Sequence, residues 1–534
     1  MADSSVLPSV NAFFALNRLG YGARPGEAAE FARHDFRIWL EEQLNPPPGD
    51  DPETVQALEN AQLRIKYAAG DPAKNQNWEA IDEMQLLGTL AQPIDVLWPT
   101  VAERDKHDGA ERRRPLLEVI SATLIRAVHS QYPLREVMCN FWHDHFNVDA
   151  WGSEQVAVAL PTYDRDVIRP NCLGNFRHLL ESVATSTAML YYLSNHSSRA
   201  GSANENYGRE LFELHTLGRQ AYLNDKYDRW RDVPGALEGQ PVGYIDEDVY
   251  ESARSFTGWT VEDGTAIDGG RKLPQTGRFA YVENWHDGYQ KRVLAADITE
   301  FRPAMADGRR VLDLVASHPA TARFVCTKLV RRLVADNPPA GLVDVSARIW
   351  RDNLHAPDQI SKVVRAIARS PEFAASRSAK VRRPFALVAC FARAGALNLM
   401  PTEPLINTLS AAGQRLYGYP NPTGLPDDKA YFLGTNSMRA RWQLVLGLAQ
   451  NSWGTGAFRP SAAMGEAALD AHGAAAFWLM AFTGSADPQQ VTAIVDGMGL
   501  APEQPIGPPD SPDTEKRLAL IAAYAAMSPG FQNC

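Results

Sequence analysis

Helical periodicity is the feature of this sequence that most restricts its fold. Apolar residues recur every three or four positions over long stretches, among them Gly308–Asp336, Val364–Ser376 and Arg517–Met527, and this spacing places them on one face of a helix. Alternating strand patterns are scarce, and Gly277–Trp285 is the best candidate for one. We predict an all-α or mainly α fold, a large multi-helix assembly with at most a short β-hairpin arm.

The chain of 534 residues is longer than a single hydrophobic core usually supports. Clusters of proline and glycine, such as Asp336–Gly341, mark its breaks. We predict an N-terminal helical region (1–130), a central region with the candidate site (131–335) and a C-terminal helical region (336–534), as separate units or as one continuous fold.

Composition excludes several classes of protein. The net charge of −10 argues against a nucleic-acid partner, because phosphate binding needs a basic face. No apolar run is long enough for a membrane span, and the five cysteines, without a CxxC pair, are expected to be reduced and mostly buried. The N-terminus lacks the pattern of a secretory signal. The sequence as it stands predicts a cytoplasmic protein; an exported protein whose signal has been removed is the alternative.

Three predicted helices carry a polar stripe led by glutamate. In Asn204–Gly218, with Asn204 as N-cap and Gly218 after the last turn, the residues Glu205, Arg209 and Glu213 follow one another at four-residue steps, and Glu210 lies beside them. The stripe therefore predicts a ladder with one cation between two anions.

The other two helices repeat the pattern at i, i+4 and i+7. Tyr244–Trp259, which Asp246 can cap, carries Glu247, Glu251 and Arg254; Pro133–Val148 carries Glu136, Asn140 and His143. Such stripes are usually solvated, and exposed ion pairs contribute only about 0–1 kcal/mol. Alternatively, the three stripes face one another across a water-filled cleft with an aromatic rim, which would suit a neutral sugar. The rim residues would be Phe141, Trp142, Tyr207, Phe256 and Trp259.

The His-Asp-His sequence invites a metal hypothesis. On a helix His143 and His145 point roughly 160° apart, so they are not expected to hold one ion together unless the helix ends at Trp142. His143 with Glu136, or with glutamates of the other helices, remains a metal site to consider. Phosphate loops, dinucleotide fingerprints and nucleophile elbows are absent from the sequence. His286 and Asp287 favour a loop anchor over an acid–base dyad.

Several segments in this order resemble the bacterial family called domain of unknown function 1800. They are FWHDHF, NENYGRELFELHTLG, DEDVYESARSFTGW, HDGYQKRVL and HPATARFVCTKLVRRLV. The resemblance covers nearly the whole chain and implies no established activity. It also implies exported bacterial relatives, often encoded beside another uncharacterised exported family. Relatives tend to have Leu-Asp-Asn where this chain has Leu193-Ser194-Asn195, and Tyr222–Gly243 is a longer loop than usual.

The leading hypothesis is a hydrolase that acts on a carbohydrate through paired carboxylates. Glu213 and Glu251 are the predicted pair, one as the acid and the other as the base or nucleophile, with Glu205 and Glu210 in reserve. Arg209 and Arg254 would keep neighbouring carboxylates ionised. Trp142 and Trp259 would stack on sugar rings, and the other predicted substrate-binding residues are His143, His286 and Asp287.

Two alternatives come from other classes. The first is a metal-dependent enzyme that uses His143 with Glu136, Glu205 or Glu210; it would need a divalent metal, whereas the leading hypothesis needs no cofactor. The second is a helical scaffold or maturation partner for the neighbouring family, in which the Glu–Arg ladders are structural. The predicted partner of the enzyme is a small-molecule or glycan substrate.

Overall fold

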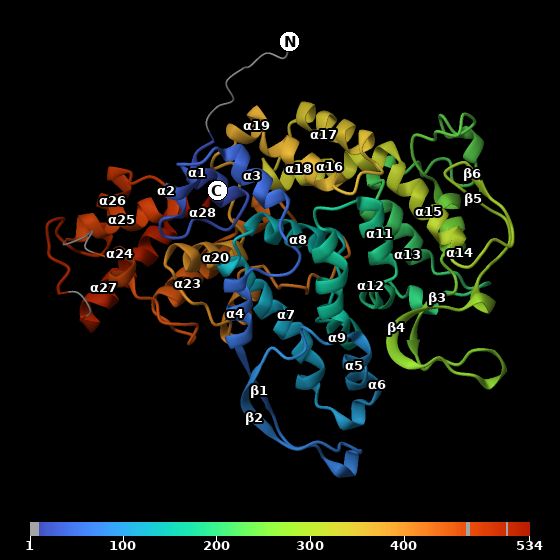
Figure 1. Ribbon diagram of the computed structural model, residues 1–534, viewed down its shortest axis with the longest axis horizontal. Coiled ribbons are helices and arrows are strands. Elements are labelled where there is room, and N and C mark those ends of the chain that lie inside the picture. Colours follow the sequence, from blue (N-terminus) through green and yellow to red (C-terminus); the bar gives the residue numbers. More distant parts are fainter. Residues whose placement is uncertain (1–9, 466–469, 509–510) are drawn as a thin grey trace.

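The structure is a computed structural model that describes residues 10–465, 470–508 and 511–534. Helices make up most of it (Figure 1), so the predicted mainly α fold is confirmed. The described residues also form three antiparallel two-stranded sheets: β1 (Gln62–Tyr67) with β2 (Ile81–Leu86), β3 (Trp259–Asp263) with β4 (Gln275–Tyr281), and β5 (Lys291–Val293) with β6 (Ala296–Ile298). β4 lies where the hairpin arm was expected, and its Tyr281 pairs with Trp259.

The N-terminal third begins with short helices and ends with a long buried one, α7. The β1–β2 hairpin projects from this part of the molecule (Figure 1). The helices are α1 (Ala12–Arg18), α2 (Glu27–Phe31), α3 (Phe36–Leu44), α4 (Pro52–Asn60), α5 (Ile94–Leu97), α6 (Pro99–Ala102) and α7 (Gly109–His129).

The central part carries the polar stripes. Here α8 lies at the centre of the molecule, while α13, α14 and the β5–β6 hairpin lie toward one end (Figure 1). The helices are α8 (Pro133–His145), α9 (Glu154–Thr162), α10 (Arg169–Asn171), α11 (Phe176–Ala184), α12 (Thr187–Tyr192), α13 (Glu205–Glu210), α14 (Asp246–Ser255), α15 (Ala306–Ser317) and α16 (Pro319–Leu333). Two π-helical segments, Tyr163–Ile168 and Leu211–His215, continue α9 and α13.

The C-terminal part extends from α17 and α18, which lie beside α16, to α24–α27, which form the end of the molecule farthest from β3 and β4 (Figure 1). Its helices are α17 (Ala340–Asp352), α18 (Gln359–Ala368), α19 (Pro371–Ala374), α20 (Pro384–Ala394), α21 (Glu403–Ala411), α22 (Lys429–Phe432), α23 (Thr435–Ala449), α24 (Pro460–Met464), α25 (Ala471–Thr483), α26 (Pro488–Gly497), α27 (Pro512–Met527) and α28 (Pro529–Gln532).

One hydrophobic cluster runs through all three parts, from Phe14 to Phe531. Arg18 is buried within it and donates to the carbonyls of Leu333 and Val334, which ties α1 to the end of α16. All five cysteines are free thiols, and four of them are buried, as expected. Among the described helices, none has the length and apolar composition of a membrane span.

Candidate functional site

The glutamates of α13 and α14 lie on two helices that pack directly against each other. Gly208 of α13 permits this contact, because a Cβ atom there would lie 2.8 Å from the carbonyl oxygen of Val249 and 2.9 Å from Oγ of Ser252. Side chains on both helices therefore share one surface. Two of the three predicted stripes meet here.

Arg209 joins the two helices through carboxylates. Its Nη2 lies 2.6 Å from Oε1 of Glu205 and 3.3 Å from Oδ1 of Asp246, and the hydroxyl of Tyr222 donates to Asp246 at 2.7 Å. Asp246 was expected to cap α14, but it serves this junction instead. Asp248 takes the capping role: its carboxylate accepts the backbone N–H of Ile245 at 2.9 Å.

The predicted ladder ends at Arg209, because the helix changes its pitch. The α-helix stops at Glu210, and Leu211–His215 form a π-helical turn, in which each residue turns through a smaller angle. Glu213 is therefore displaced from the row of Glu205 and Arg209. It lies 3.5 Å from Nε of Arg219, a side chain that is itself exposed.

Glu210 has the most distinctive electrostatic environment of the predicted catalytic residues. Burial, followed by the negative charge of Glu213, raises its pKa to about 7, and the charge of Arg209 opposes this only in part. Within the described residues, Glu210 has no ion-pair partner within 4 Å. At neutral pH a substantial fraction of this carboxyl is protonated.

On α14 as well, one carboxylate, Glu251, is bound by an arginine, and a second, Glu247, has a raised pKa. Both oxygens of Glu251 accept hydrogen bonds of 2.8 Å from Nη1 of Arg254, which also holds Asp287 through Nε at 2.8 Å. Glu247 lies one turn earlier; burial and the charge of Glu251 raise its pKa. Arg254 thus binds both neighbouring carboxylates. Burial acts to raise the pKa of Asp287, but the hydrogen bonds from Arg254 and from the backbone N–H of Tyr289, together with the charges of Arg254 and Lys291, lower it overall.

His286 and Asp287 hold a loop in place. Nε2 of His286 lies 3.2 Å from Oδ2 of Asp307, and its Nδ1 lies 2.9 Å from the carbonyl oxygen of Thr257. Because Asp287 binds Arg254 instead, the two residues do not form a dyad. This arrangement agrees with a loop anchor, and both side chains are mostly buried rather than presented to a substrate.

The two predicted sugar-stacking residues do not face solvent. Trp142 and Trp259 are both fully buried at 0% exposure. The indole N–H of Trp142 donates to the carbonyl of Cys172 at 2.8 Å, and Trp259 packs edge-on against Phe256 and Phe279. The stacking role is therefore a wrong assignment: apolar packing, which a sequence pattern does not distinguish from a sugar platform, accounts for both rings.

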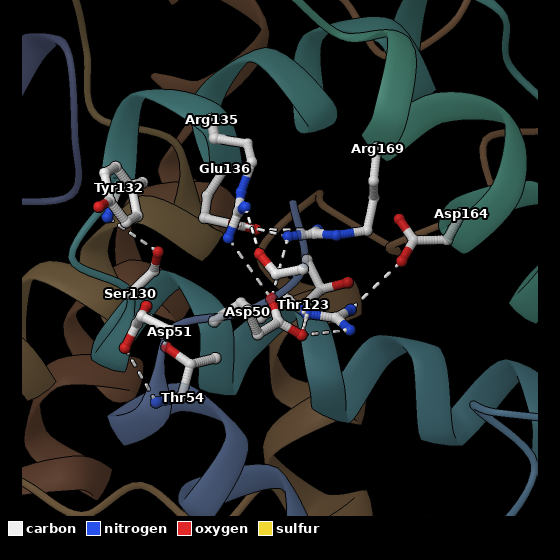
Figure 2. Close-up of polar contacts among 12 residues, drawn as sticks. Asp50, Asp51, Thr54, Thr123, Ser130, Tyr132, Arg135, Glu136, Asp164 and Arg169 are labelled. Atoms are coloured by element: carbon white, nitrogen blue, oxygen red, sulfur yellow. Dashed lines mark hydrogen bonds and ion pairs between the residues drawn. The ribbon is translucent and has the colours of Figure 1, made fainter. Parts of the chain in front are cut away.

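The stripe of α8 points into the protein and not into a cleft shared with α13 and α14. Glu136 is 4% exposed and binds Arg169 through two hydrogen bonds, of 2.6 and 2.9 Å (Figure 2). Arg135 approaches the same carboxylate at 3.3 Å. The third expected wall of the cleft is thus an internal ion-pair cluster.

This cluster is balanced in charge. Three carboxylates lie among three guanidinium groups, and Figure 2 shows the carboxylates between α7, α8, α10 and the loop before α4. The carboxylates are those of Asp50, Glu136 and Asp164, and the guanidinium groups are those of Arg126, Arg135 and Arg169. Charged side chains that are removed from water in this way need partners of opposite charge.

The metal hypothesis receives no geometric support from these residues. His143 lies 2.9 Å from Asp164, while Nε2 of His145 lies 3.1 Å from the carbonyl oxygen of His215. The two rings bind different partners, as their helical spacing predicts, and Glu136 is held by arginines. Across the parts of the chain that the structure describes, no three His, Cys, Asp or Glu side chains are placed to hold a metal ion.

Sequence reasoning missed one acidic residue on α14, Asp248, and left a second, Glu247, out of the catalytic set. Asp248 is buried, which raises its pKa to about 7 although it accepts backbone N–H groups of Ile245 and Leu294. Glu247 was assigned to the stripe but not to the catalytic set. The third position of a helix is a common place for a carboxylate that binds back to the N-cap, and this signal would have found Asp248.

The comparisons with known proteins give one match. The model of the family described as a protein of unknown function, DUF1800, matches residues 14–533. No curated protein and no solved structure matches the chain. Since the match covers nearly the whole chain, as the segments around α8, α13 and α14 predict, the protein belongs to the DUF1800 family.

Proposed function

We propose that the protein is a hydrolase that cleaves a carbohydrate, with Glu210 as the general acid and Glu213 as the general base or nucleophile. The observation that carries the proposal is the position of Glu210: its carboxyl is half-buried on the helix that also carries Glu213, and among the described residues it has no ion-pair partner within 4 Å. Burial and the charge of Glu213 accordingly raise its pKa to about 7. A general acid must be protonated near the working pH, and hydrolysis of a glycosidic bond needs one protonated and one ionised carboxyl.

The surroundings of the pair are compatible with these roles. Nε of Arg219 lies 3.5 Å from Oε1 of Glu213 and places a positive charge beside this carboxylate. Burial raises the pKa of Tyr192 to about 12, and the negative charges of Asp149 and, to a smaller extent, Glu210 contribute to the rise. The hydroxyl of Tyr192 donates to the carbonyl of Pro420 at 3.1 Å. Because Tyr192 is only half-buried, its ring is a better candidate for a sugar contact than the two fully buried tryptophans.

The other predicted catalytic glutamates have supporting roles in this proposal. Glu205 is bound to Arg209, which joins α13 to α14, and Glu251 is bound to Arg254. Both arginines keep the framework around the pair in place. A helical scaffold without activity would contain the same ion pairs, so the experiment must test turnover and not only stability.

The test is release of reducing ends from a panel of polysaccharides and aryl glycosides between pH 4 and pH 9. We expect turnover of at least one substrate, and a loss of about 100-fold or more in kcat for Glu210→Gln and for Glu213→Gln. Glu59→Gln, at an exposed position of α4, is the matched control. A panel that stays intact, or full activity in Glu210→Gln, would overturn the proposal.

A further inference from the structure

A cavity of about 940 Å³ lies beside α16, and the described residues that line it include neither Glu210 nor Glu213. One wall is the end of the long loop Tyr222–Gly243, and others come from the segment after the π-helical turn and from the end of α15. Leu217, Val242, Leu294 and Leu314 give it an apolar lining. The volume is that of a site for a small organic ligand.

Three cationic side chains line this cavity, and one of them, Arg323, is paired with Asp344. Lys328 and Arg331 line both the large cavity and a neighbouring one of about 240 Å³, which extends to the loop around Gly424. Among the described residues, neither side chain has a carboxylate within 4 Å. The next residue, Arg332, differs, since it binds Asp144 at 2.6 Å and Asp427 at 2.7 Å.

Lys328 is held in an environment that disfavours its charge. Burial lowers the pKa of its ammonium group to about 8, and the charges of Arg332 and Arg331 act in the same direction, against Asp144 and Asp427. The ring of Phe324, with its centroid 5.6 Å from Nζ, gives a weak compensating contact. The half-buried ammonium group of Lys328 faces both cavities. A charge that is partly removed from water is stabilised by a partner of opposite charge, and a bound anion would provide one.

Charge balance separates this cavity from the other arginine-rich one. A cavity of about 470 Å³ is lined by Arg126, Arg135 and Arg169, but these belong to the balanced cluster with Asp50, Glu136 and Asp164. The arginines there already have their anions. In the large cavity, by contrast, Lys328 and Arg331 are the lining cations that no carboxylate of the described residues approaches within 4 Å.

The loop wall of the large cavity is fixed by a buried histidine. Nε2 of His318 donates to the carbonyl of Pro241 at 2.9 Å, and its Nδ1 accepts the backbone N–H of Ala320 at 3.1 Å. The ring is therefore a single neutral tautomer, and burial lowers its pKa accordingly. One side chain both caps α16 and anchors the loop, so the cavity is formed before any ligand enters.

We propose that this cavity binds an organic anion with an apolar chain, of the class of medium-chain carboxylates. Its head group lies between Lys328 and Arg331, and its chain lies against Leu314 and Val242. The ligand needs both its chain and its head group. The apolar walls of the cavity remove the chain from water, and the cations form a charge-assisted contact with the head group. The site is separate from Glu210 and does not depend on the proposed hydrolase activity.

Isothermal titration calorimetry of the full chain with octanoate tests the proposal. We expect saturable binding at one site, with much weaker binding of acetate, which lacks the chain, and of octan-1-ol, which lacks the charge. Lys328→Met should weaken octanoate binding about tenfold or more, whereas Lys516→Met, at an exposed position of α27, should not change it. Glu210→Gln should bind octanoate as the unmodified protein does.

A pH comparison identifies the cation. The groups facing Lys328 are Asp144 and His145 of α8, His215 of the π-helical turn, Asp427, and Arg331 and Arg332 of its own helix. From pH 7 to pH 9.5 the ammonium loses its proton, so octanoate affinity should fall in the unmodified protein and stay constant in Lys328→Arg. Equal binding of octan-1-ol and octanoate, or unchanged affinity in a folded Lys328→Met protein, would overturn the proposal. If Lys328→Met does not fold, octanoate affinity is measured in Leu314→Gln instead. Weaker binding would place the site in this cavity, and unchanged binding would place it elsewhere and overturn the proposal.

Discussion

Glu136 and Arg169 form a two-point ion pair in the interior: Nη2 lies 2.6 Å from Oε1, and Nη1 lies 2.9 Å from Oε2. Removing one member leaves a guanidinium group with incomplete compensation in a buried place. We expect Glu136→Gln to lower the free energy of unfolding by about 3 kcal/mol or more, measured by urea denaturation.

The double substitution Glu136→Met with Arg169→Met is the companion to this experiment. It removes both charges, so it should recover part of the stability that the single substitution loses. A Glu136→Gln protein within about 0.5 kcal/mol of the unmodified one would contradict the role assigned to the pair.

The carboxyl of Glu210 makes stability depend on pH. Its folded pKa of about 7 lies above the ordinary value of 4.5, so the native state holds this proton more tightly than the unfolded chain does. The native state is therefore destabilised progressively as pH rises from 4.5 to 7. Glu210→Gln should be as stable as the unmodified protein at pH 4 and more stable at pH 8, by thermal denaturation. The same gain at both pH values would rule out titration as its source.

Gly208 sets the distance between α13 and α14. An added methyl group would lie 2.8 Å from the carbonyl oxygen of Val249, so Gly208→Ala should destabilise the protein by about 1–3 kcal/mol. Gly341→Ala on α17 is the matched control, because nothing lies within 4 Å of its Cβ position and alanine favours a helix by about 1 kcal/mol. In calorimetry we expect Gly208→Ala to lower the stability and Gly341→Ala to raise it. An increase in stability for both substitutions would show that α13 can move away from α14 freely.

Asp248 fastens the β5–β6 hairpin to α14. One carboxylate oxygen accepts from Ile245 N–H and the other from Leu294 N–H at 2.6 Å. An asparagine amide would place an NH₂ group against one of these donors, so Asp248→Asn should cost about 1–3 kcal/mol. Hydrogen exchange should show faster exchange at Leu294 and at the start of α14. Protection equal to that of the unmodified protein would mean that other contacts hold the hairpin.

Local chemistry made part of the site predictable. Asn204 caps α13, with its side chain accepting from Asn206 and Tyr207, and Gly218 has a φ of 84°, as its place after the last turn suggests. The pairing of Glu205 with Arg209 follows from helical spacing alone. These features depend on residues within a few positions of one another, which is the information a sequence pattern contains.

The remaining features depend on contacts between distant segments. The sequence predicted one regular helix through Glu213, but packing gives a π-helical turn at Leu211–His215. A helical pattern also shows that Glu136 lies opposite an apolar stripe, but not that Arg169, 33 positions away, covers it. Lys328 belongs to a predicted helix, and only the fold shows that it lies between two cavities.

The end of the loop Tyr222–Gly243 forms a cavity wall, and the hydrogen bond from His318 to the carbonyl of Pro241 joins it to the start of α16. A wall made from a loop can lengthen or shorten without disturbing the helices behind it. Relatives with a shorter segment here would present a wider or shallower recess while keeping the same framework. We therefore expect that, among relatives, the size of the anion bound in the proposed site varies with the length of this segment.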